Sequence, residues 1–253
     1  MNFAIEAACG CNIGRVRKNN EDNFFFDNKS LELVNQGLPT PLFFSGIVKR
    51  GLCFAVFDGM GGENYGEVAA YTAATHLQKT KRTLLDYFIS LKEYLNKLTL
   101  QLNEAIIDTQ KVFCTDRCGS TMAALYFSSN SVYVCNIGDS RAYRLRGSKF
   151  LQLSTDHVEN YPSHKKKKSP LTQHLGIDPN TMQIEPSIVN SKLHRGDKFL
   201  LCSDGLTDML TDLEISAIMS GHQNVNDCVN ALICSALEHG GHDNITVIVC
   251  NLK

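Results

Sequence analysis

The chain has 253 residues, of which 43% are hydrophobic and 20% are charged, and its net charge is −1. This composition excludes wholesale disorder, and the near-zero charge argues against a protein that coats nucleic acid or an anionic membrane. No apolar run approaches the roughly 20 residues of a transmembrane helix, and the N-terminus has no secretory signal pattern. The ten cysteines are scattered, and several lie within apolar runs, among them Cys53, Cys135, Cys202 and Cys250. This distribution favours buried free thiols in a reducing cytoplasm.

The first half of the chain predicts a strand followed by two helices. A continuous apolar run at residues 52–57 has the length of a strand that is covered on both faces. A helix is predicted from Tyr65 to Lys79. A second, long helix is indicated by apolar residues three and four apart between Leu84 and Val112, which form one stripe. We expect this stripe to pack on a sheet rather than in a coiled coil.

The second half predicts further strands and two more helices. The order is strand 132–137, hairpin 142–153, strand 199–202, helix 213–219, helix 225–238 and strand 245–250. The hairpin is indicated by two alternating segments on either side of Gly147-Ser148. Many strands with interspersed helices predict one compact layered domain that spans residues 1–253.

Acidic residues stand where the predicted strands meet loops. The positions are Glu21, Asp22, Asp58, Asp139, Asp204 and Asp243. Strands lying side by side would bring these ends together, and clustered carboxylates repel one another unless a cation is bound. All-oxygen ligands suit Mg²⁺ or Mn²⁺ rather than Zn²⁺. Two such ions would position a water and lower its pKa for attack at phosphorus.

Two of these aspartates precede glycine, in Asp58-Gly59 and Asp204-Gly205. A single Asp-Gly pair is typical of a turn. Where several strand ends bring carboxylates together around an ion, a glycine would also let the backbone approach that ion closely and adopt a positive φ.

Seven short motifs occur in an order that covers residues 11–250. They are GRVRKNNED at 14–22, VFDGMGG at 56–62, GST at 119–121, IGDSR at 137–141, LSTDH at 153–157, CSDGL at 202–206 and GHDNITV at 241–247. In this ordered set the chain resembles the metal-dependent Ser/Thr protein phosphatases of the PPM (PP2C) family, bacterial type. Any one of the motifs is weak, whereas the ordered set is highly specific.

The resemblance implies an α+β fold, a PP2C-like α/β sandwich of two antiparallel β-sheets flanked by antiparallel helix pairs. It implies a protein Ser/Thr phosphatase that hydrolyses phosphoserine and phosphothreonine monoesters. The water would be activated at a dinuclear Mn²⁺ or Mg²⁺ site, without a covalent intermediate. The expected partners are phosphoprotein substrates of a cognate Ser/Thr kinase, with no nucleic acid and no membrane. We expect a cytoplasmic monomer.

The resemblance also implies a role for each acidic position. Asp58 would bridge the two ions, and the carbonyl of Gly59 would bind one of them. Asp204 and Asp243 would hold the other ion. Asp139, together with Asp204, would bind a third ion, as in many bacterial members.

Further residues are implied to support these ligands or to bind the substrate. Glu21 and Asp22 would act on the ions through water or from behind the direct ligands. Arg17 matches the family's phosphate-contacting arginine, whose planar guanidinium suits two phosphate oxygens. Asn244 would orient Asp243 or a bound water.

Two departures from the family pattern concern steps outside the metal site. Met60 stands where some eukaryotic members have a histidine that is a proposed general acid, so the proton donor to the leaving group is unidentified. His157 has the chemistry of a proton donor, but its turn-like segment favours a structural role. The flap at residues 158–170 is short and carries Lys165–Lys168, which affects substrate selection more than catalysis.

Two other functions stay open at the level of the sequence. Cys135 and Arg141 fit the Cys-x5-Arg pattern of cysteine phosphatases. However, the residues after Arg141 alternate as a strand, whereas that chemistry needs a helix N-terminus, and Asp139 would lie in the phosphate cradle. The second alternative is a catalytically weak regulatory or phosphopeptide-binding PP2C-like module. The complete set of metal-binding residues argues against it.

Overall fold

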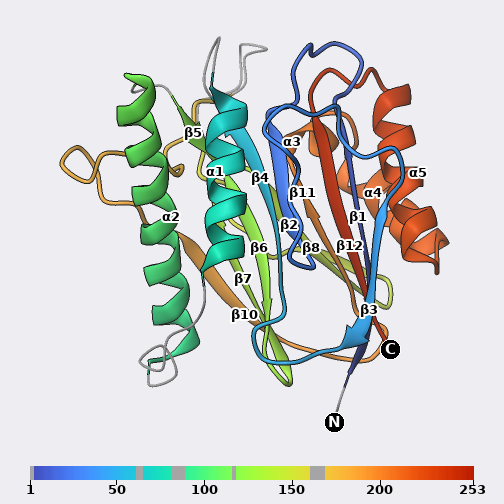
Figure 1. The fold of residues 1–253 in the computed structure, drawn as a ribbon. Helices are drawn as coiled ribbons and strands as arrows, with labels where there is room; N and C mark the ends of the chain where they lie inside the picture. Colours follow the sequence, from blue (N-terminus) through green and yellow to red (C-terminus); the bar gives the residue numbers. More distant parts are fainter. Residues whose placement is uncertain (1–2, 61–64, 81–88, 116–117, 160–168) are drawn as a thin grey trace.

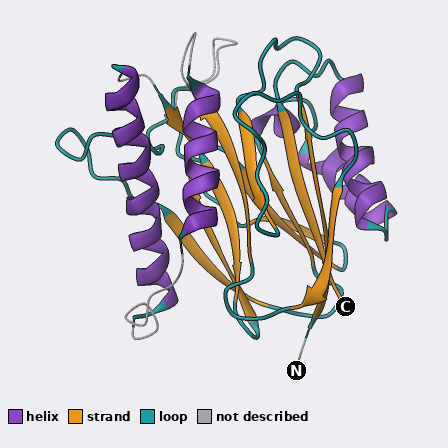
Figure 2. Cartoon of the chain, viewed as in Figure 1, coloured by secondary structure: helices purple, strands orange, loops and turns teal. Residues whose placement is uncertain are grey.

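Two β-sheets pack face to face, with helices against both outer faces, in the computed structural model of this chain (Figure 1). The structure describes residues 3–60, 65–80, 89–115, 118–159 and 169–253. Neighbouring strands within the two sheets are antiparallel. Figure 2 shows the sheets between two groups of helices. This arrangement is the α+β sandwich that the sequence predicts.

The first sheet contains strands from both ends of the chain. Its order is β3 (Leu42–Ile47), β1 (Ala4–Asn12), β12 (Ile245–Leu252), β11 (Lys198–Cys202), β8 (Arg141–Arg146) and β9 (Lys149–Gln152). β8 and β9 form the predicted hairpin. β1 and β12 pair along their length, so the N-terminal and C-terminal segments lie side by side.

The second sheet provides the strand that carries Asp58. Its order is β10 (Ser187–Lys192), β7 (Ser131–Ile137), β6 (Met122–Phe127), β4 (Cys53–Met60) and β2 (Asp22–Phe26), with β5 (Gly119–Ser120) paired to the end of β4. The prediction that this strand ends at residue 57 is wrong. Asp58 pairs with Asp22, and Gly59 pairs with Ser120, so pairing on both sides extends β4 and places Asp58 within it.

A core of buried apolar side chains lies between the sheets. The ring centroids of Phe54 and Phe127 are 6.2 Å apart, and those of Phe127 and Phe199 are also 6.2 Å apart. All three side chains are fully buried, and they come from both sheets. Burying one phenylalanine contributes roughly 1.5–3 kcal/mol, so this row of rings is a main source of cohesion between the sheets.

Helix pairs cover the two outer faces. The helices are α1 (Gly66–Lys79) and α2 (Leu91–Phe113) on the second sheet, and α4 (Asp212–Gly221) and α5 (Val225–Glu238) on the first. Tyr65 precedes α1 and its ring centroid lies 5.2 Å from that of Phe113 at the end of α2, so these two helices run antiparallel. The long helix packs on a sheet, as predicted. No helix within the described ranges is long and apolar enough to cross a membrane.

The start of α2 is set by a capping box rather than by the apolar stripe. The Ser90 hydroxyl accepts a hydrogen bond from the backbone N–H of Glu93 at 3.2 Å, and the Glu93 carboxylate accepts one from Ser90 N–H at 2.7 Å. These reciprocal bonds satisfy the first free donors of the helix and begin it at Leu91. The predicted helical residues Leu84 and Phe88 lie outside the described residues.

All ten cysteines are free thiols, as the sequence predicts. Cys135, Cys202 and Cys250 are buried, whereas Cys53 is only partly buried. Cys135, Cys202 and Cys250 lie in apolar runs that form buried strands, which accounts for the burial of their thiols.

Ser90→Ala should lower the free energy of unfolding by about 1 kcal/mol, because it leaves a helix N–H without its acceptor. Urea denaturation measures the change. Ser90→Thr is the matched control, since it keeps the hydroxyl. Equal stability of the Ala variant and the wild type would show that the capping box contributes nothing to the fold.

Candidate active site

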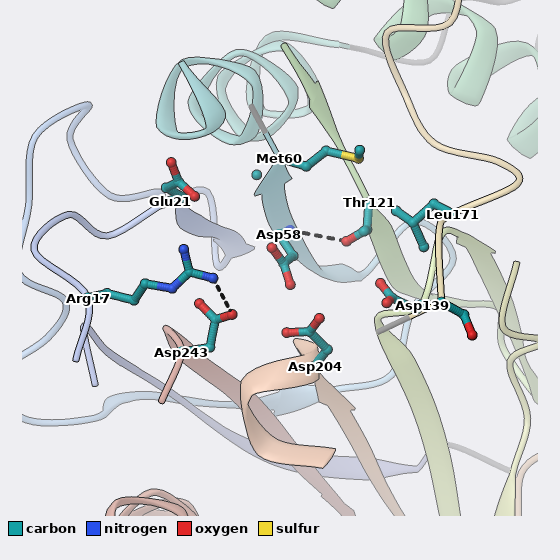
Figure 3. A pocket seen from close by; sticks show the side chains of 11 residues that line it. Arg17, Glu21, Asp58, Met60, Thr121, Asp139, Leu171, Asp204 and Asp243 are labelled. Carbon is teal, nitrogen blue, oxygen red and sulfur yellow. Dashed lines mark hydrogen bonds and ion pairs between the residues drawn. The ribbon is translucent and has the colours of Figure 1, made fainter. Parts of the chain in front are cut away.

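A cavity of about 330 Å³ lies where strands of both sheets end, and its wall carries carboxylates from segments far apart in the sequence (Figure 3). It is lined by Arg17, Glu21, Asp58, Gly59, Met60, Thr121, Asp139, Ser169, Leu171, Asp204 and Asp243. Every residue assigned to metal or phosphate binding from the sequence is in this wall except Asp22, and Asn244, which was assigned a supporting role, is also outside it.

The strand pattern explains why these carboxylates meet. β4 carries Asp58 near its C-terminal end, and β7 leads into the turn that contains Asp139. β11 ends just before Asp204, the first residue of α3 (Asp204–Thr207). β12 begins two residues after Asp243. Strands of both sheets thus deliver one acidic residue each to the same place.

Glycine is required after two of these aspartates by close backbone packing. A Cβ at Gly59 would overlap the carbonyl oxygen of Gly66, and a Cβ at Gly205 would overlap that of Asn244. Neither Gly59 nor Gly205 has a positive φ, so the prediction of that conformation is wrong at both positions. The close approach is to neighbouring backbone, at the start of α1 and beside the Asp243 segment.

Arg17 lies in the cavity wall and pairs with Asp243. Its Nη2 donates to Asp243 Oδ2 at 2.7 Å (Figure 3), and this bond raises the pKa of the guanidinium. The two side chains are 47% and 25% exposed, so water screens the pair and its net stabilisation is small. The sequence predicts separate roles for these residues, in phosphate and metal binding, and the structure brings both to one side of the cavity.

Asn244 holds the loop between β1 and β2. Its Oδ1 accepts from the backbone N–H of Glu21 at 2.7 Å, and its Nδ2 donates to the carbonyl oxygens of Ile13 and Asn19 at 2.8 and 3.0 Å. The side chain therefore positions Glu21, and the predicted contact with Asp243 is made by the Asn244 backbone. The backbone N–H of Asn244 donates to Asp243 Oδ1 at 2.9 Å.

Asp22 lies beneath the cavity and is only 2% exposed. Its Oδ2 accepts hydrogen bonds from Ser203 Oγ at 2.7 Å and from Thr246 Oγ1 at 2.6 Å. Burial raises the pKa of this carboxyl above its ordinary value, although both hydrogen bonds oppose the shift. Asp22 belongs to β2, whereas its donors follow β11 and lie in β12. This carboxylate therefore joins the two sheets directly under the site.

The donor atoms around the cavity suit a hard divalent cation. Five carboxylates face it, Gly59 is part of its wall, and Arg17 is the one cationic side chain among the described lining residues. Burial raises the pKa of Glu21, since a buried negative charge is costly when its neighbours are also acidic. A bound cation removes that cost.

The carboxylates surround the cavity rather than converge on one point. Among the described His, Cys, Asp and Glu side chains, no group of three or more is close enough to form a finished metal-binding cluster. The space between them is comparable to that of a small-ligand pocket. It can therefore contain more than one ion together with water or a phosphate group.

His157 does not line the cavity. Its Nδ1 accepts from the backbone N–H of Gly138 at 3.1 Å, and the backbone N–H of His157 donates to the Gly138 carbonyl at 3.0 Å. Burial lowers the pKa of the imidazole, which favours the neutral acceptor form. These bonds support the structural role favoured from the sequence, because they hold the turn that carries Asp139.

The flap is described only at its two ends. Val158 and Leu171 form a bridge between these ends, and Leu171 reaches the cavity wall opposite Arg17 (Figure 3). His164 and Lys165–Lys168 lie outside the described residues.

Hydroxyl residues in and behind the wall were not assigned from the sequence. Thr121 Oγ1 accepts from the backbone N–H of Asp58 at 3.1 Å and lies 2.7 Å from Ser140 Oγ. Both residues are in motifs that resemble the family, but hydroxyl side chains at such spacing carry no metal-site signature. The same holds for Ser203 and Thr246, which bind Asp22.

A family model described as "Protein phosphatase 2C" matches residues 42–233. The chain belongs to the protein phosphatase 2C (PP2C) family. The match covers most of the chain. The PP2C motifs at residues 14–22 and 241–247 lie outside the matched range and extend the likeness towards both ends of the chain.

Individual PP2C relatives resemble the chain over nearly its whole length. It is 28% identical to "Serine/threonine phosphatase stp" of Listeria innocua, over 93% of this chain and 91% of that protein. The solved structure titled "PppA, a key regulatory component of T6SS in Pseudomonas aeruginosa" has a TM-score of 0.78 at 26% identity, covering 100% of both chains. The catalytic domain of PstP, a serine/threonine protein phosphatase in complex with two manganese ions, has a TM-score of 0.76 at 27% identity, covering 99% of both.

Gly205→Ala should destabilise the protein by roughly 1–3 kcal/mol, since its methyl group has to displace the backbone of Asn244. Urea denaturation measures this change. Gly221→Ala is the control, because a Cβ at Gly221 has nothing within 4 Å. A Gly205→Ala variant as stable as the wild type would show that the α3 segment and the Asp243 segment are not packed as described.

Proposed function

We propose that this PP2C-family chain is a protein Ser/Thr phosphatase that hydrolyses phosphoserine and phosphothreonine monoesters and depends on Mn²⁺ or Mg²⁺. The observation that carries the proposal is a single cavity whose wall holds five carboxylates and one arginine. Oxygen donors of this kind bind hard cations, and a guanidinium binds phosphate oxygens. The names of the relatives and the manganese ions in the PstP structure support the same activity and cofactor.

In this proposal each aspartate of the wall is a ligand of particular ions. Asp58 would be shared by two ions, the Gly59 carbonyl would help to hold one of them, and Asp204 and Asp243 would hold the other. Asp139, with Asp204, serves a third ion. When bound, the ions activate a water for attack at phosphorus and offset the charge of the phosphate. The positions of these residues around one cavity support this division.

The remaining polar residues bind the substrate or support the ligands. Arg17 exchanges its contact with Asp243 for phosphate oxygens, and the high exposure of its side chain makes that movement possible. Glu21 lies in the wall, where it can act on the ions through water. Asp22 does not bind an ion directly but supports the residues that do, because Ser203 and Thr246 already donate hydrogen bonds to its carboxylate.

The substrates are phosphoproteins, and we propose that they are those of a cognate Ser/Thr kinase. Residues 1–253 act as one phosphatase domain, because the cavity combines Arg17 near one end of the chain with Asp243 near the other. We further propose a cytoplasmic monomer that binds neither nucleic acid nor membrane. The near-neutral charge and the ten free cysteines support this part of the proposal.

A catalytically weak regulatory or phosphopeptide-binding module is less well supported. Such a module has no need of a complete ligand set. In this chain every acidic position implied by the PP2C resemblance is retained, and all but Asp22 line the cavity.

Asp204→Asn should lower kcat on a phosphothreonine peptide by at least about a hundredfold, because metal activation of water contributes several kcal/mol. Phosphate release in Mn²⁺ and in EDTA measures this loss and the metal dependence. Asp108→Asn makes the same chemical change on the exposed face of α2 and should leave kcat unchanged. Wild-type activity that survives EDTA, or an active Asp204→Asn variant, would contradict the proposal.

The cysteine-phosphatase alternative does not fit the surroundings of Cys135. This thiol is buried in β7, 3.6 Å from Thr99 Oγ1, and burial raises its pKa to about 11. Cysteine chemistry at phosphorus needs an accessible thiolate. Arg141 instead forms a bidentate pair with Asp156, in which Nε donates to Oδ1 and Nη2 donates to Oδ2. The residues after Arg141 form β8 rather than a helix.

Cys135→Ser should keep most of the activity and lower the free energy of unfolding by roughly 1–3 kcal/mol, the cost of a more polar group in the core. Iodoacetamide should inactivate the wild type slowly, because the thiol is protonated and covered. An inactive but folded Cys135→Ser variant, judged by circular dichroism, would support a cysteine mechanism instead.

A further inference from the structure

Ser140 is a buried hydroxyl with one side-chain hydrogen-bond partner in the described part of the chain. That partner is Thr121, with 2.7 Å between the two oxygens. A buried hydroxyl loses more from an unused hydrogen than from an unused lone pair, because the stranded donor bears the full desolvation penalty. Thr121 is almost as buried, but it lines the cavity whereas Ser140 does not, so only the Thr121 hydrogen has another place to go. We therefore assign Ser140 as the donor and Thr121 as the acceptor.

Thr121 then has no free lone pair. Its Oγ1 accepts from Ser140 and also from the backbone N–H of Asp58 at 3.1 Å. A hydroxyl has two acceptor lone pairs and one hydrogen, so the hydrogen of Thr121 has to point away from both partners. Thr121 belongs to the cavity wall, which leaves this hydrogen available to a group inside the cavity.

Contacts of its backbone, methyl group and hydroxyl oxygen hold Thr121 in place. Its backbone N–H donates to the Asp58 carbonyl at 2.8 Å. Its methyl group packs against Gly138, where an added Cβ would lie 2.6 Å from Thr121 Cγ2. Because backbone, methyl group and hydroxyl are all fixed, the direction of the hydroxyl hydrogen is set before any ligand binds.

We propose that the Thr121 hydroxyl donates a hydrogen bond to a phosphate oxygen of the substrate. Figure 3 shows Arg17 and Thr121 on opposite sides of Asp58, so the two residues contact a phosphate above Asp58 from two directions. A neutral donor attracts the phosphate without adding a positive charge that competes with bound cations. This inference rests on the proposed phosphatase function and adds a substrate-binding residue to it.

The test compares Thr121→Val, which keeps the shape and removes the hydroxyl, with Thr121→Ser, which keeps the hydroxyl. Calorimetry on the full chain gives the affinity for Mn²⁺, and then for inorganic phosphate in the presence of Mn²⁺. We expect Thr121→Val to weaken phosphate binding and to lower kcat/KM by roughly 10- to 100-fold, the usual effect of losing a hydrogen bond to a charged group. Mn²⁺ affinity should be unchanged. Thr121→Ser should restore most of both losses.

Ser140→Ala gives an independent check, because it removes the donor that orients Thr121 and leaves the Thr121 hydroxyl in place. We expect a smaller loss of phosphate affinity than in Thr121→Val. Unchanged phosphate affinity in Thr121→Val would overturn the inference. An equal loss of Mn²⁺ and phosphate binding would also overturn it, since Thr121 would then only position Asp58. A wild-type chain that binds Mn²⁺ and phosphate but hydrolyses no phosphopeptide contradicts the proposed function alone, and the binding data still decide the role of Thr121.

Discussion

The buried carboxylate of Asp22 makes the hydrogen bonds that join the two sheets beneath the cavity, and the positions of the acidic residues depend on them. One of its oxygens accepts hydrogen bonds from Thr246, in a strand of the opposite sheet, and from Ser203, which directly follows another strand of that sheet. Asp22 also pairs in register with Asp58, and Ser203 directly precedes Asp204. Hydrogen bonds to a charged group contribute about 1.5–3 kcal/mol each. Two of them offset part of the cost of burying the charge and fix the distance between the two sets of acidic residues.

Neutral polar groups surround the charged wall. Amide and hydroxyl side chains of Asn244, Thr121 and Ser203 bind the backbone or the carboxylates from behind. A lysine or arginine in these positions would neutralise the carboxylates and weaken their attraction for a cation. The chain therefore obtains a rigid acidic cavity by supporting it with groups that carry no charge of their own.

Much of this arrangement could be predicted from the sequence, because strong local patterns coincide with the final structure. The apolar runs identify the buried strands, and the helix over residues 225–238 has the predicted limits. The ordered motifs led to the fold and to the acidic residues of the wall. The end of β4 could not be predicted, because it depends on pairing with Asp22 on one side and with Ser120 on the other. Such pairing involves distant segments and leaves no local signal.

The roles of the polar residues were harder to predict than their positions. Asn244 adjoins Asp243 in sequence, yet its side chain binds the loop near Glu21, more than 200 residues away. The glycines after Asp58 and Asp204 were expected to need a positive φ, whereas what they need is the absence of a Cβ. In both cases the deciding partner is brought in by the fold, and spacing along the chain gives no information about it.

The pairing of β1 with β12 has a consequence for how the protein is made. β12 follows all the other described strands in the sequence, so β1 lacks its neighbour on that side of the sheet until residues 245–252 have been synthesised. Closing a loop of that length is slow compared with forming local structure. During this interval the edge of the unfinished sheet is open to other chains and to proteases. Asp243 lies two residues before β12, so a nascent chain cannot assemble the acidic cavity until this segment has also been synthesised.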